Sequence, residues 1–230
     1  MGVAMTNIKT DSGLDVLKTI KGLLKTGWTL DEANRILWKD SPAAFPVGLQ
    51  FVNSRIAICV KDSANNTICC DDGYGIKIES GTKDYRVYVY TSPNGSIGIS
   101  VHSLMVLERL NIVFIKSSIN NEMHPSYTPV AACYSGNNGA RMLFPGTTKG
   151  INLPYIYYPS DSYIYGNGGY TLLNIANPCT DTPANDFYVM GSKSTGISVY
   201  PPVIISSGTK KFIGLHMYTS GSPIYYMRYA

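Results

Sequence analysis

The chain is poor in charge, and its few cations are dispersed. Charged residues make up 15% of the 230 positions, against about 25% in typical globular domains. The net charge is +4, and among the lysines and arginines only Lys210 and Lys211 are adjacent. Proteins that bind nucleic acid usually gather their cations into a stripe or a patch. The composition therefore disfavours a nucleic-acid partner.

Long apolar runs are also lacking. A transmembrane helix needs about 18 or more consecutive apolar residues, whereas the run at residues 112–115 is typical of this chain. The polar stretch at residues 6–12 leaves no room for the apolar region of a signal peptide. We therefore expect synthesis in a cytoplasm, no export signal and no membrane span.

Motifs for catalysis and metal binding are missing as well. The three histidines fall in separate segments, and the chain has neither an H-x-x-x-H pair nor a G-x-S-x-G sequence. The cysteines are odd in number and form no C-x-x-C pair. We predict that they are free, mostly buried thiols, and that the chain is not an enzyme and has no metal, cofactor or catalytic residue. The cysteines are Cys59, Cys69, Cys70, Cys133 and Cys179.

Tyrosine is abundant and unevenly distributed. Fourteen of the eighteen tyrosines follow His124, in a stretch with only nine charged residues. Tyrosine combines a large apolar ring with one polar tip, which suits strands and interfaces where one end stays wet. We predict a binding surface where these residues are densest, with about half of the rings serving only to pack the sheet. Its candidate residues are Tyr155, Tyr157, Tyr158, Tyr163, Tyr165, Asn167 and Tyr170.

The first part of the chain carries two helix-start signals. Ser12-x-x-Asp15 and Thr29-x-x-Glu32 both match the capping box, so residues 1–46 are predicted to hold a short helical hairpin. Such a pair resembles a DNA-reading helix-turn-helix. Acidic residues in the first turn of the second helix would repel phosphate, however, so packing is favoured over DNA binding.

The rest of the chain has the pattern of short antiparallel strands. Residues 47–52 and 55–60 flank a tight turn at Asn53-Ser54, and residues 85–90 and 97–101 form a second hairpin. We divide the chain into a β-rich region at 47–116, a loop or linker at 117–128 and a Tyr/Gly-rich β domain at 129–230. The predicted fold class is mainly β, with the helical hairpin followed by an antiparallel β-sandwich or barrel-like regions.

In overall style the chain resembles bacteriophage virion proteins, particularly tail, neck or fibre-associated components. The resemblance covers the capped helices at 12–38, the many short strands, and the Gly/Asn/Ser/Tyr-rich segments 155–170 and 220–229. It implies a structural protein that resides in the virion and forms a homo-oligomer. Its partners would be other virion proteins and a host-surface glycan.

Two other functions stay open at this point. A lectin-like carbohydrate-binding module would stack sugars on Tyr163, Tyr165 and Tyr170. A glycosidase or other hydrolase would need a pair of carboxylates, for which Asp181 and Asp186 are candidates.

Overall fold

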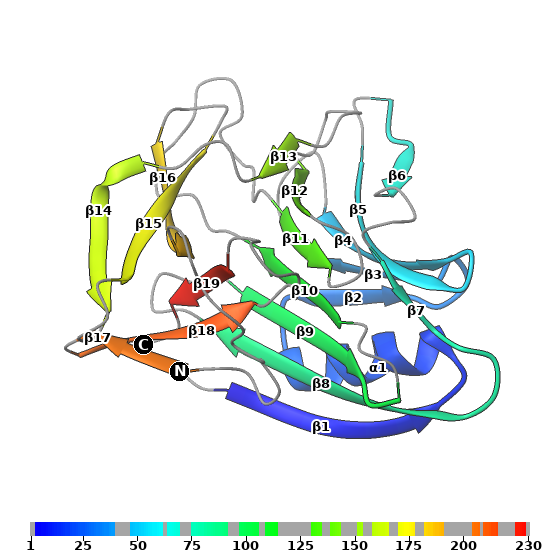
Figure 1. Ribbon diagram of the computed structural model, residues 1–230. Coiled ribbons are helices and arrows are strands. Elements are labelled where there is room, and N and C mark those ends of the chain that lie inside the picture. Colours follow the sequence, from blue (N-terminus) through cyan, green and yellow to red (C-terminus); the bar gives the residue numbers. More distant parts are fainter. Residues whose placement is uncertain are drawn as a thin grey trace.

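Figure 1 shows the computed structural model of the chain. After Met105, the structure describes side chains only at Ile112, Thr209 and Lys211. The structure describes residues 3–39, 47–61, 64–69, 75–91, 97–105, 109–114, 130–134, 139–143, 151–153, 158–165, 170–177, 182–190, 204–207, 209–215 and 224–228.

The described chain is mainly β, as predicted, with antiparallel sheets and one short helix. The largest, sheet A, has seven strands in the order β1-β8-β9-β10-β11-β12-β13. It joins the start of the chain to strands on both sides of the predicted linker at 117–128, which itself lies outside the described residues. The strands are β1 (Val3–Thr10), β8 (Lys83–Thr91), β9 (Ile97–Ser103), β10 (Arg109–Phe114), β11 (Val130–Tyr134), β12 (Gly139–Leu143) and β13 (Ile151–Leu153).

Sheet B is built from neighbours in sequence, in the order β2-β3-β4-β5-β6, with β7 paired to β5. Its central hairpin is the predicted one: Val52 pairs with Arg55 across a two-residue turn. The strands are β2 (Trp28–Asp31), β3 (Ile36–Lys39), β4 (Val47–Val52), β5 (Arg55–Lys61), β6 (Thr67–Cys69) and β7 (Ile76–Lys77).

Sheet C contains the later strands, in the order β14-β15-β16-β19-β18-β17. Among the described strands, none of the three sheets closes on itself, because each order has two ends. The strands are β14 (Tyr158–Tyr165), β15 (Tyr170–Asn177), β16 (Thr182–Met190), β17 (Ile204–Ser207), β18 (Lys210–Leu215) and β19 (Ile224–Arg228).

The first predicted helix is confirmed as α1 (Gly13–Leu24). Ser12 caps it, since its hydroxyl accepts a hydrogen bond from the amide of Asp15 at 3.4 Å. The helix ends where Lys25 adopts a φ of 65°, two residues before Gly27. Val16, Leu17 and Ile20 are fully buried, so α1 presents one apolar face to the sheets.

The predicted second helix, and with it the helical hairpin at 1–46, is wrong. Residues 28–39 form the β2–β3 hairpin, in which Leu30 pairs with Leu37. The carboxylate of Asp31 accepts hydrogen bonds from the amide and side chain of Asn34 at 3.0 and 2.8 Å. Asp31, predicted to lie in the first turn of that helix, therefore closes a turn between strands, and Arg35 in the same turn takes a φ of 55° that no right-handed helix allows.

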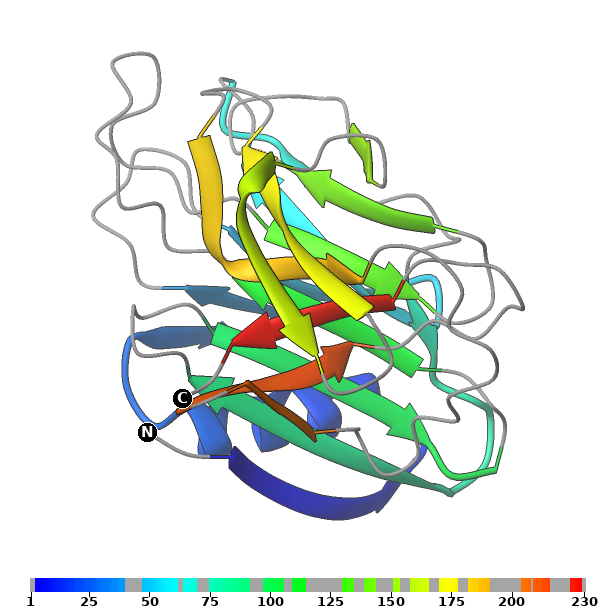
Figure 2. The same cartoon turned by 60° about the vertical axis from the view of Figure 1, so that its left-hand side comes forward.

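One buried cluster joins α1 to both of the first two sheets. It contains Leu17 and Ile20 from α1, Leu49 and Ile58 from sheet B, and Val87 from sheet A, among others. Figures 1 and 2 show β18 and β19 on the side of β8 and β9 that faces away from α1. The strands β8 and β9 thus lie in the middle of the molecule.

Candidate functional site

The structure brings part of the predicted tyrosine surface together. Tyr158, Tyr163 and Tyr165 lie on β14, and the register places Tyr165 directly opposite Tyr170 of β15. Residues opposite each other in an antiparallel pair lie on the same face. Tyr155, Tyr157 and Asn167 lie outside the described residues. The binding role of this surface stays a prediction.

A feature that the sequence reasoning missed is the edge strand β1. It pairs with β8 along its whole length, from Val3 opposite Tyr90 to Thr10 opposite Lys83. Its other side has no strand partner among the described residues, because β1 ends the order of sheet A. Figure 1 shows it as the long dark-blue strand at the bottom of the molecule.

The two faces of β1 differ in exposure. The even-numbered positions point inward, and Ile8 packs against the buried cluster. The odd-numbered positions are exposed: Val3 at 42% and Met5 at 50%, followed by Asn7 and Lys9. The side-chain oxygen of Asn7 accepts a hydrogen bond from Nε of Arg86 at 2.9 Å, which fixes that row to the neighbouring strand.

An edge of this kind is able to take another strand. Proteins usually protect long edges with proline, bulges or several charges. β1 has no proline and only one charged residue, Lys9, and its eight pairs with β8 run in unbroken register. Strand addition uses the free backbone amides and carbonyls for affinity and the alternating side chains for specificity. The exposed edge of β1 is therefore the best-defined candidate interaction site.

The face of sheet B opposite the apolar cluster holds a cysteine pair. Successive registers align Trp38, Gly48, Cys59 and Cys69 in one row across four strands. Both cysteines are free thiols, as predicted; Cys59 is fully buried and Cys69 is half-buried. The Cys69 thiol donates a hydrogen bond to the side-chain oxygen of Gln50 at 2.7 Å.

The two thiols differ in acidity. Burial raises the pKa of Cys59 well above its usual range, and its neighbour Cys69 adds to that rise. Hydrogen bonding from Cys59 lowers the pKa of Cys69. This effect is larger than the opposing rise that the partial burial of Cys69 causes. The ammonium of Lys61 lies 5.5 Å from the centre of the Trp38 ring, at one end of the same row.

A second buried polar group lies on the face of sheet A opposite the apolar cluster. Tyr88 and Tyr90 stack with ring centres 6.0 Å apart, and the His102 ring lies 5.3 Å from that of Tyr88. Burial raises the pKa of Tyr90 above its usual range, although a contact with the Ser100 hydroxyl opposes the rise. Because His102 is only 3% exposed, this group is inaccessible to a substrate in solution.

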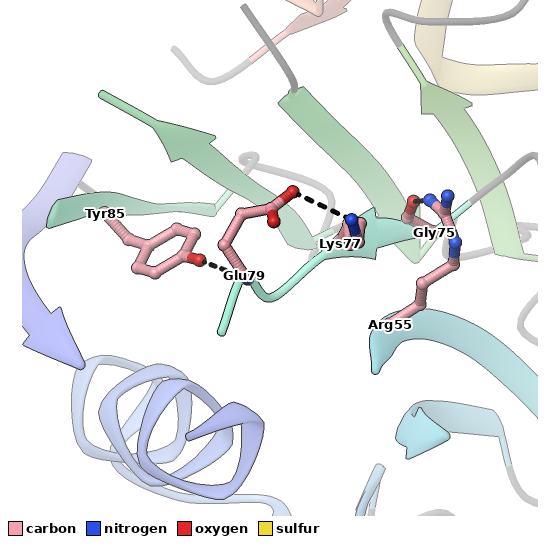
Figure 3. Close-up of polar contacts among 5 residues, drawn as sticks. All are labelled: Arg55, Gly75, Lys77, Glu79 and Tyr85. Carbon is pink, nitrogen blue, oxygen red and sulfur yellow. Dashed lines mark hydrogen bonds and ion pairs between the residues drawn. The ribbon is translucent and has the colours of Figure 1, made fainter. Parts of the chain in front are cut away.

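Polar contacts around β7 secure the junction of sheets A and B (Figure 3). Arg55 donates to the carbonyl of Gly75 at 2.8 Å. The amide of Glu79 donates to the buried Tyr85 hydroxyl at 3.0 Å, and the Glu79 carboxylate pairs with Lys77 at 3.3 Å. Each group has a partner within the fold, so the role of this cluster is best explained as stabilising the packing of neighbouring strands.

The described residues contain few groups suited to other chemistry. Within them, no three His, Cys, Asp or Glu side chains gather where they would hold a metal ion. In the same residues no helix has the length and apolar character needed to cross a membrane. Of the two carboxylates considered for hydrolysis, Asp186 lies on β16 and Asp181 lies outside the described residues.

Comparison with known proteins gives no match. No family model, no curated protein and no solved structure matches the chain.

Proposed function

We propose that this chain is a structural and interaction component that forms a homo-oligomer through the exposed edge of β1. The observation that carries the proposal is the eight-residue edge strand, which ends a seven-stranded sheet and exposes Val3 and Met5. The occupant of the edge is β1 of a second copy, paired antiparallel.

Symmetry restricts how two copies pair. A twofold axis perpendicular to the sheet requires one residue to face its own copy. The midpoint of the eight-residue strand falls between Thr6 and Asn7, and the proposed register places Thr6 on the axis. Met5 then faces Asn7 of the second copy, and Val3 faces its Lys9. The single charged residue of the strand therefore meets an apolar neighbour instead of a like charge, and the two sheets continue into one.

The wider setting follows from the sequence resemblance. A homo-oligomer built by sheet continuation suits a phage-like particle, in which this chain would reside in the virion beside other virion proteins. The Tyr-rich strands β14 and β15 would offer a second contact surface, and a sandwich arrangement of the sheets would leave the edge of β1 accessible. A gene position among capsid and tail genes would support this setting.

Light scattering coupled to size-exclusion chromatography tests the oligomer over a range of protein concentrations. The wild-type chain should elute with at least twice the mass of one chain. Met5→Lys should weaken association about tenfold, because it places two new cations diagonal to Lys9 of the other copy and removes apolar contact. A wild-type chain that stays monomeric at every concentration would contradict the proposal.

Two further variants separate pairing from folding. Met5→Lys combined with Asn7→Asp places opposite charges across the twofold axis and should restore association. Met105→Lys makes the same change at another exposed methionine, 66% accessible, and should leave the oligomer intact. Equal loss in Met5→Lys and Met105→Lys would show that β1 is not the contact.

A further inference from the structure

The register of sheet B places two thiols at disulfide distance. Cys59 of β5 and Cys69 of β6 are direct cross-strand partners. Such partners have Cα atoms about 4.5 to 5.5 Å apart, which lies inside the range of about 4.4 to 6.8 Å that a disulfide spans. The two thiols are close enough for each to shift the pKa of the other.

We propose that Cys59 and Cys69 are a thiol-oxidation site that closes to a cross-strand disulfide with a low-molecular-weight disulfide, such as oxidised glutathione, as the oxidant. The bond ties β6, the edge strand of sheet B, to β5. β6 otherwise holds to the sheet by only three paired residues, Thr67, Ile68 and Cys69.

The different environments of the two cysteines set the order of events. Cys59 is fully buried, so a reagent from solution reaches Cys69 first. Thiolates are the attacking species in exchange, and the lowered pKa of Cys69 increases its thiolate fraction. Cys69 is thus the attacking cysteine and Cys59 the resolving one.

The exchange balances in two steps. The Cys69 thiolate attacks one sulfur of the oxidised reagent, whose S–S bond breaks, and one reagent thiolate leaves and takes up a proton. Cys59 then gives up its proton and attacks the sulfur of Cys69, and the second reagent thiolate leaves. Two protein thiols are oxidised, and one disulfide of the reagent is reduced to two thiols.

Closure also removes a polar contact. The bond from the Cys69 thiol to Gln50 ends with the loss of the S–H group, so the side-chain oxygen of Gln50 loses this donor, while its amide nitrogen still donates to the carbonyl of Asn34. Trp38 belongs to the same row of residues, and the ammonium of Lys61 lies over its ring. Oxidation therefore alters this face of sheet B as well as its edge.

Peptide mapping of the full chain in glutathione redox buffers tests the site directly. Trypsin cleaves after Arg55, Lys61 and Lys77, so Cys59 lies in peptide 56–61 and Cys69 in peptide 62–77. After alkylation of free thiols, the oxidised protein should show these two peptides joined and lighter by two hydrogens. Full alkylation of both cysteines in strongly oxidising buffer would overturn the proposal.

Three serine variants identify which two cysteines form the disulfide and which of them reacts first. Cys70→Ser should leave the joined peptides unchanged, whereas Cys69→Ser should abolish them. Cys59→Ser should stop the reaction at a glutathione adduct on Cys69. Joined peptides that persist in Cys69→Ser, or an adduct that forms on Cys59 first in the wild-type chain, would refute the assigned pair.

Discussion

Two glycines of α1, Gly13 and Gly22, differ in the space that is open to an added Cβ atom. A Cβ atom at Gly13 would overlap the ring of Phe51 on β4, whereas a Cβ atom at Gly22 would meet nothing within 4 Å. Both positions have ordinary helical backbone, since neither is among the glycines with positive φ. Gly13 is the buried first residue of α1, whereas Gly22 lies exposed near its end, so the two sites compare a crowded helical position with an open one.

Alanine at the two glycines should therefore have opposite effects. Gly13→Ala should lower the free energy of unfolding by about 1 to 3 kcal/mol, because the Phe51 ring has to move in a packed region. Gly22→Ala should raise it by about 0.5 to 1 kcal/mol, because alanine loses less backbone entropy in a helix. Urea unfolding of both variants measures the difference. Stabilisation by both would show that the α1–β4 contact is loose.

At the scale of elements, the β4–β5 turn carries a small strain. Asn53 and Ser54 have φ values of 50° and 60°, the pattern of a type I′ turn, which favours Asn-Gly. Ser54→Gly should raise the free energy of unfolding by about 0.5 to 1 kcal/mol, since glycine adopts positive φ without steric cost. The backbone bond from Ile78 to the carbonyl of residue 54, 2.8 Å long, is kept.

Ser80→Gly serves as the control for this turn. Ser80 is exposed and has no positive φ, so glycine there should bring no gain. Thermal unfolding of the two variants distinguishes a specific turn effect from a general effect of glycine. An equal shift of both melting temperatures would rule out strain at Ser54.

Local patterns predicted the elements whose signals lie close together in the chain. The hairpins around Asn53-Ser54 and between residues 85 and 101 follow from alternating side chains and a nearby turn, and helix α1 follows from its cap. The second helix was wrong because Thr29 and Glu32 have the spacing of a capping box while Asp31 in fact binds Asn34. Short capping motifs do not distinguish a helix start from a turn.

Features that depend on residues far apart in the chain could not be predicted from local sequence patterns. β1 has a polar, mixed sequence and becomes a strand by pairing Val3 with Tyr90, far along the chain. The cysteine pair has the same origin, because only the register of β5 and β6 brings Cys59 beside Cys69. The free state of these thiols was predictable, but their proximity was not.

At the scale of the whole molecule, sheet A is covered on both faces at β8 and β9. Val87 and Val89 belong to the apolar cluster with α1, while Tyr88 and Tyr90 point the other way and are also buried. Alternate residues of a strand face opposite sides, so burial of both sets requires a layer on each side. Figure 2 shows strands of sheet C on the second side.

This layering predicts a pH dependence of stability. Burial raises the pKa of Tyr90 in the folded chain, whereas the unfolded chain loses this proton near pH 10. Above about pH 10 the folded state binds the extra proton, so the stability of the wild-type chain should fall by about 1.4 kcal/mol per pH unit relative to Tyr90→Phe. Below about pH 10 the difference should be constant.

Urea unfolding of both proteins at a series of alkaline pH values measures that difference. Tyr88→Phe provides a comparison on the same face of the sheet, next to the same layer. If the wild-type and Tyr90→Phe curves stay parallel above about pH 10, the Tyr90 hydroxyl is open to water and the second layer does not cover it.

The β2–β3 hairpin has an optical consequence. The chain has two tryptophans, and both belong to this hairpin: Trp28 on β2, 5% exposed, and Trp38 on β3, half-buried beneath Lys61. The intrinsic tryptophan emission of the whole protein therefore originates from one hairpin of sheet B. A dissolved quencher should reach Trp38 before Trp28, which gives a spectroscopic view of one side of the molecule without any attached dye.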